Sequence, residues 1–90
     1  MSLNWYMCHV YGAGSTYGNT VTIGLKENGG KFEQWFSADT AQQRELLATG
    51  LAALSTGYEV SVGLEDTVPM PPPNGAPLKH MVLCNWDAAK

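Results

Sequence analysis

Four residues that could bind a metal ion or act as nucleophiles occur in two pairs, Cys8-His9 near one end of the chain and His80-x-x-x-Cys84 near the other. Both pairs fall in segments with the composition of β-strands. Adjacent side chains of a strand point to opposite faces, and residues 80 and 84 would lie about 13 Å apart at about 3.3 Å per residue. One tetrahedral zinc ion cannot collect all four ligands. We therefore expect no metal site and no cofactor.

No catalytic motif accompanies these residues. A nucleophilic cysteine needs a neighbouring base or a positive environment that lowers its pKa, and nothing in the sequence around Cys8 or Cys84 suggests one. The glycines at 12, 14 and 18 resemble a phosphate-binding loop only superficially, because no helix follows them and the expected lysine is missing. We predict that the protein is not an enzyme and that His9 and His80 are ordinary strand residues.

Residues 12–19 are rich in glycine and small polar side chains, which predicts a flexible loop. Sugars are bound by aromatic rings that stack on their C–H faces and by neutral hydroxyl and amide groups. Strand alternation places one further ring, that of Trp35, on the outer face, opposite Phe32 and Phe36. The alternatives are a solvated turn without a ligand and a tryptophan that serves a subunit interface. The predicted ligand-binding residues are Ser15, Thr16, Tyr17, Asn19 and Trp35.

The charge of the chain bears on its partners. Its net charge is −3, with only five lysine and arginine residues in 90. Proteins that bind single-stranded nucleic acid draw much of their affinity from clustered basic side chains. The basic residues here are scattered along the chain, which argues against a nucleic-acid partner: Lys26, Lys31, Arg44, Lys79 and Lys90. No apolar run approaches the roughly 20 residues of a membrane-spanning helix, so we expect no membrane span.

The order of the predicted elements indicates the fold class. Three strands, at 3–11, 19/20–26 and 31–36, precede a helix at 39–56, and two strands follow it at 58–64 and 80–86. The proline-rich segment 65–78 is predicted to be a loop, because proline lacks a ladder donor. This order, in one domain spanning 1–90, predicts a mainly β protein with one helix, an OB-fold built as a five-stranded Greek-key barrel.

The predicted helix has recognisable ends and a wide apolar face. Asp39-x-x-Gln42 has the form of a capping box, and Gly57 suits a left-handed C-terminal position. Leucines at 47, 51 and 54 predict the buried stripe. A second strip at 46, 50 and 53 widens the apolar face, which fits either simple packing or a helix–helix contact between subunits.

The two cysteines are predicted to form a disulfide. The first and last strands of such a barrel are neighbours, so a bond between Cys8 and Cys84 is geometrically reasonable. It would close a loop of about 75 residues and contribute roughly 4 kcal/mol in the chain-entropy model. The alternative is two reduced, buried thiols.

One stretch of the sequence resembles a known family. The pattern Phe36-Ser-Ala-Asp…Glu45-Leu-Leu…Leu54-Ser-Thr-Gly57-Tyr-Glu-Val60-Ser-Val62 is similar to the helix and following strand of bacterial toxin B subunits of the subtilase-cytotoxin and pertussis-toxin type. The resemblance covers about a third of the chain, and the proline-rich segment departs from it. It implies a ring of five subunits, with helices lining the centre, that recognises cell-surface glycans and carries a catalytic subunit.

The sequence thus predicts a non-enzymatic, ring-forming protein that binds cell-surface glycan. A structural or assembly protein that binds only protein partners, of phage or secretion origin, is the alternative, and a single-stranded nucleic-acid-binding module is disfavoured by charge. We expect a secreted or periplasmic protein, with residues 1–3 as an expression scar in place of a signal segment. A cytoplasmic location stays open at this stage.

Overall fold

The computed structural model describes residues 3–16 and 20–87. These residues form six strands and one helix, so the predicted mainly β class with a single helix is confirmed. The elements run in the order β1 (Leu3–Thr16), β2 (Thr20–Glu27), β3 (Glu33–Ala38), α1 (Gln43–Thr56), β4 (Tyr58–Glu65), β5 (Ala76–Leu78) and β6 (His80–Asp87).

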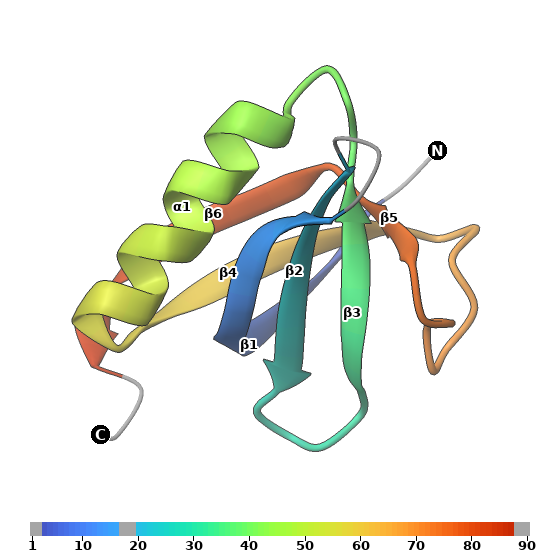
Figure 1. Ribbon diagram of the computed structural model, residues 1–90. Helices are drawn as coiled ribbons and strands as arrows, with labels where there is room; N and C mark the ends of the chain where they lie inside the picture. The colour runs from blue at the N-terminus through green and yellow to red at the C-terminus, as the bar shows by residue number, and fades with distance from the viewer. Residues whose placement is uncertain (1–2, 17–19, 88–90) are drawn as a thin grey trace.

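The strands form one curled, mixed sheet in the order β5-β3-β2-β1-β4-β6. The pairing of β3 with β5 is parallel, and the other pairings are antiparallel. β1 explains the curl, because its first half pairs with β4 and its second half with β2. Figure 1 shows this long strand bending between its two neighbours, with α1 lying obliquely along one side of the sheet.

β1 is longer than predicted. The sequence-based boundary placed the end of this strand at residue 11 and a loop at 12–19, but the strand continues to Thr16. A bulge accounts for the difference: Val10 pairs with Leu25 and Gly12 pairs with Gly24, so Tyr11 is an extra residue on β1. Past the bulge the glycine-rich sequence keeps pairing with β2, and the predicted loop was wrong over this part.

The core fills the inner face of the sheet. The apolar residues that alternate along β2, Val21, Ile23 and Leu25, are all buried, as are Phe32 and Phe36. Strand alternation therefore identifies the inner faces of β2 and β3 correctly.

The face on which α1 packs was predicted wrongly. Leu46, Gly50 and Ala53 are buried against the sheet, whereas Leu51 and Leu54 are 50% and 42% exposed. A Cβ on Gly50 would lie only 3.1 Å from the Cβ of Ala13, so the helix approaches β1 closely through its smallest residue. Of the predicted stripe, Leu51 and Leu54 therefore lie on the outward side of α1, whereas Leu47 is partly buried and packs against the core.

The prediction for the start of the helix was wrong, and the prediction for its end is confirmed. The helix begins at Gln43, not 39, and Gln42 makes no side-chain capping hydrogen bond, so the predicted capping box does not form. A backbone turn precedes the helix instead, in which the Gln42 N–H donates to the Asp39 carbonyl at 3.0 Å. At the other end Gly57 is left-handed, with φ of 77°, as predicted.

Two further expectations about the strands were wrong. The segment 65–78 contains a short strand, β5, within which Pro77 is tolerated because β5 lies at the end of the sheet order. The strands that carry the cysteines are not neighbours, since β4 lies between β1 and β6.

The predicted disulfide is therefore not formed, and both cysteines are free thiols. Two strand spacings separate Cys8 from β6 by about 10 Å, whereas the Cα atoms of a disulfide lie within about 7 Å of each other. The described part of the chain also contains no helix with the length and apolar character that a membrane crossing requires.

Candidate functional site

Two exposed aromatic rings meet on the outer face of the sheet. Tyr11, from β1, and Trp35, from β3, pack edge to face with ring centroids 5.4 Å apart and an interplanar angle of 80°. Their residues are 42% and 40% exposed, although both rings are large and apolar. Such a pair on a folded domain is a candidate binding surface. We call Tyr11 and Trp35, with the two glycines described next, the aromatic patch.

Two glycines allow these rings to lie against the sheet. Gly12, Gly24 and Trp35 are opposite one another on three adjacent strands. A Cβ on Gly12 would lie 2.5 Å from Cη2 of Trp35, and a Cβ on Gly24 would lie 2.7 Å from Cε1 of Tyr11. The Trp35 ring therefore reaches across β2 to β1, and the Tyr11 ring covers β2. Because Gly12 and Gly24 have no side chains, both rings can pack directly on the backbone of the sheet.

The bulge in β1 sets the position of Tyr11. In a regularly alternating strand without a bulge, Val10 and Gly12 would lie on the same face of the sheet. In the structure Val10 is buried in the core, whereas Gly12 lies beneath the outward ring of Trp35. Tyr11 and Gly12 consequently both belong to the outer face, and the tyrosine ring comes close to Trp35.

Residues that are opposite one another on β1, β2 and β3 form rows across the sheet, and the rows on either side of the aromatic patch carry different kinds of side chain. On one side Gly14, Thr22 and Ser37 are opposite one another, so two hydroxyl side chains and one open backbone position follow the rings. A Cβ on Gly14 would meet nothing within 4 Å, which leaves space there for a ligand. Neutral hydroxyls beside aromatic rings are the groups that sugars require.

A charged row lies on the other side of the patch, where Lys26 of β2 is opposite both His9 and Glu33. The pKa of Tyr11 is raised above its ordinary value, first by burial and then by the negative charge of Glu33. Its phenol therefore stays protonated at neutral pH and can donate a hydrogen bond to a ligand.

The segment after β4 fixes the backbone under Trp35. The Trp35 N–H donates to Oδ1 of Asn74 at 3.3 Å, and the Gly75 N–H donates to the Trp35 carbonyl at 2.7 Å. Gly75 has φ of 89°, a conformation that favours glycine. These contacts anchor the backbone of β3 at the residue that carries the ring of Trp35.

The structure separates the predicted ligand-binding residues. Trp35 is on the outer face, as alternation predicted. Ser15 pairs with Val21, whose side chain is buried, so Ser15 belongs to the inner face at the end of β1 and not beside Trp35. Thr16 is the last residue of β1, and Tyr17 and Asn19 lie outside the described residues.

Three residues of the aromatic patch were absent from the predicted site: Tyr11, Gly12 and Gly24. Alternation alone did not show which face of β1 carries Tyr11. The signal that could have connected it with Trp35 was the pair of glycines on adjacent strands, because glycine inside a strand often marks a close approach by another group.

The cysteines and histidines do not form a reactive centre. Burial, with the charges of Glu27 and Glu59 adding to it, raises the pKa of Cys8 to about 12, which makes its thiol unreactive. The pKa of Cys84 is also raised, mainly by burial. Within residues 3–16 and 20–87, no three His, Cys, Asp or Glu side chains are grouped so that they could hold a metal ion.

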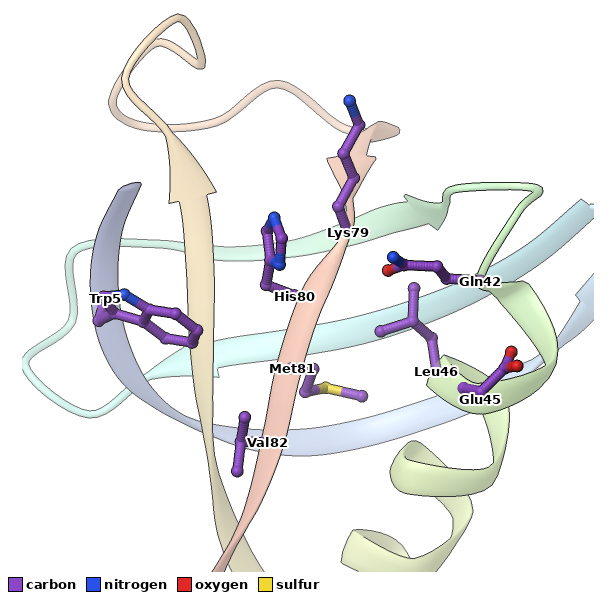
Figure 2. A pocket seen from close by; sticks show the side chains of 8 residues that line it. All are labelled: Trp5, Gln42, Glu45, Leu46, Lys79, His80, Met81 and Val82. Carbon is purple, nitrogen blue, oxygen red and sulfur yellow. The ribbon is translucent and has the colours of Figure 1, made fainter. Parts of the chain in front are cut away.

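A second surface feature is a hollow of about 390 Å³ at β6. Figure 2 shows Trp5 on one side of β6, with its ring directed across β4 toward His80, and α1 on the other side. The Trp5 and His80 rings are tilted at 58° with centroids 6.3 Å apart. Like Trp35, Trp5 lies over a glycine, because a Cβ on Gly63 would be 3.1 Å from its ring.

Comparisons of this chain with protein-family models, with curated proteins and with solved structures find no match. The candidate site therefore rests on the geometry of its own residues.

Proposed function

We propose that this protein is a non-enzymatic carbohydrate-binding domain that recognises glycan through the aromatic patch. The observation that carries the proposal is the pair of exposed rings, Tyr11 and Trp35, held over two glycines beside a row of hydroxyl groups. A pyranose ring would stack on the exposed part of Trp35. Its hydroxyl groups would bond to Thr22, Ser37 and the phenol of Tyr11.

We further propose that the fold is of the OB type. β5 and β6 are separated only by Lys79, and they pair with β3 and β4 respectively. Taken as one bent strand, they would join the two ends of the curled sheet and give a five-stranded barrel with the helix between its third and fourth strands. OB-folds bind oligosaccharides and oligonucleotides on a strand face. The scattered lysines favour the sugar over the nucleic acid.

Self-association into a ring, with five subunits as the favoured number, is the second part of the proposal. Leu51 and Leu54 are exposed on α1, and no residue from 46 to 57 is charged. Two copies of a protein of net charge −3 repel each other. A neutral apolar helix face lets two subunits contact each other without placing like charges side by side. Size-exclusion chromatography with light scattering, on wild type and on Leu51→Lys with Leu54→Lys, tests this part. A monomeric wild type would contradict it.

Glycan-array binding by three variants tests the sugar site. Trp35→Ala and Tyr11→Ala should each lose most of the array signal. Trp5→Ala is the matched control, since Trp5 is also an exposed tryptophan over a glycine but lies at the β6 hollow. Equal signals from Trp35→Ala and wild type would remove the proposed site. An array without any signal, from a wild-type protein that forms a stable oligomer, would favour the alternative of an assembly protein with only protein partners.

A further inference from the structure

β6 has a free edge. Among the described strands it pairs with β4 alone, at His80 to Leu83 and again at Asp87, and it stands last in the sheet order. In an antiparallel pair, alternate residues turn their N–H and C=O groups away from the partner strand. Just before β6, at Leu78 of β5, the backbone already has a partner. The Leu78 carbonyl accepts a hydrogen bond from the Asp39 N–H at 2.9 Å. From residue 80 to 83 the edge offers backbone donors and acceptors to an added strand.

α1 packs against β6, but residues 80–84 of this edge lack the charges and prolines that usually prevent strand addition. Edge strands are commonly protected by charged side chains or by proline. Residues 80–84 are His-Met-Val-Leu-Cys, with no proline, lysine or carboxylate among them. Lys79, the residue before this stretch, is held by Glu65 in an ion pair of 2.9 Å. Val82 is 55% exposed and presents an apolar side chain beside the edge.

The hollow has a different character on each side of β6 (Figure 2). Trp5, His80 and Val82 make the outer side largely apolar and aromatic. On the other side the first turns of α1 contribute Gln42, Glu45 and Leu46. Within the part of the chain that the structure describes, the carboxylate of Glu45 makes no ion pair. A volume of about 390 Å³ lies at the lower end of the range for ligand-binding clefts.

We propose that the free edge of β6 binds an extended segment of a partner protein in which apolar residues alternate with lysine or arginine. An added strand presents successive side chains to opposite faces. Its apolar residues would contact Trp5 and Val82 on the outer side, and its basic residues would reach Glu45 on the helix side. This docking surface is separate from the aromatic patch, so it holds whether or not that patch binds sugar.

Binding of a synthetic peptide tests the proposal. The probe is a labelled, end-capped peptide of eight residues in which valine alternates with lysine, measured by fluorescence anisotropy. We expect Val82→Lys to abolish binding, and Glu45→Gln to weaken it roughly threefold to fivefold, as for an exposed ion pair. Met70→Lys and Glu33→Gln are the matched controls, because one puts lysine in place of an exposed apolar residue and the other puts glutamine in place of an exposed glutamate, both outside the hollow.

Modified peptides identify the mode of binding. N-methylation of alternate residues blocks one edge of the peptide, so one of the two possible methylated versions should lose affinity and the other should keep it. Equal binding of both versions, or wild-type affinity in Val82→Lys, would overturn the proposal. So would dimerisation of the free protein that Val82→Lys abolishes, since the occupant of the edge would then be a second copy.

Discussion

The indole ring of Trp35 lies over Gly12, two strands away. A Cβ on Gly12 would be 2.5 Å from Cη2 of the ring, a distance that side chains do not adopt. Both residues are paired with Gly24, so the ring crosses the whole width of β2. The orientation of an exposed tryptophan is thus set by a residue that has no side chain, and the aromatic patch depends on that residue.

Gly12→Ala should displace Trp35 and destabilise the protein. The new methyl group meets a rigid ring and not a flexible chain, and overpacking of this kind costs about 1–3 kcal/mol. We expect a lower melting temperature, a changed tryptophan emission and a weakened glycan signal. Gly14→Ala is the control on the same strand and face for the melting temperature and the emission, because a Cβ there meets nothing within 4 Å. If both variants behave alike, strand conformation and not the Trp35 contact determines the effect.

The close contact between α1 and β1 predicts a sharp limit on residue size at position 50. Gly50→Leu should destabilise the fold by about 3 kcal/mol, because the Cβ alone would lie 3.1 Å from that of Ala13. Ala48→Leu places the same side chain on the exposed side of the helix and should change the free energy of unfolding by at most about 0.5 kcal/mol. Urea unfolding followed by circular dichroism measures both. A tolerant position 50 would contradict the close approach of helix and sheet.

The leucines of α1 should differ strongly in their contribution to stability. Leu46→Ala empties a buried site and should cost about 2–4 kcal/mol. Leu51→Ala removes a half-exposed side chain and should cost less than about 1 kcal/mol in the monomer. Thermal unfolding at low protein concentration compares them. A larger loss at Leu51 would mean that the helix packs through the leucine stripe after all.

Strand faces could be predicted from the sequence because each buried strand alternates. Val21, Ile23 and Leu25 are buried, and Trp35 is exposed, as a period of two requires. The bulge at Tyr11 could not be predicted, because one extra residue reverses the alternation without leaving a mark in composition. The aromatic patch depends on this bulge, so the sequence indicated only one of its two rings.

The helix face was ambiguous for a different reason. Two adjacent strips, one with three leucines and one with Leu46, Gly50 and Ala53, both follow the helical period. Hydrophobicity favours the leucines. At position 50 the space beside Ala13 and Ile23 has no room for a large side chain, so the strip that contains glycine at this position packs inward. The sheet determines how much space is left for the side chains of the helix. That space cannot be predicted from the sequence of the helix alone.

Stability should fall at alkaline pH because of Cys8. Its pKa is raised from 9.0 to about 12, chiefly by burial, with Glu27 and Glu59 adding negative charge nearby. Below pH 9 the thiol is protonated in both folded and unfolded states and has no effect. Between 9 and about 12 only the unfolded state loses the proton, so the free energy of unfolding falls by up to about 1.4 kcal/mol per pH unit.

Urea unfolding of wild type and Cys8→Ala between about pH 8 and pH 10.5 isolates this contribution. Other groups that titrate in this range, such as tyrosines and lysines, are common to both proteins and cancel in the comparison. Cys8→Ala should therefore lose less stability than wild type as the pH rises, although it starts from a lower value because a buried atom is missing. Cys84→Ala is the control, since Cys84 is less buried. If the free energy of unfolding falls equally with pH in wild type and Cys8→Ala, the Cys8 thiol has the same pKa in the folded protein and in the unfolded chain. Neither burial nor the charges of Glu27 and Glu59 would then raise that pKa.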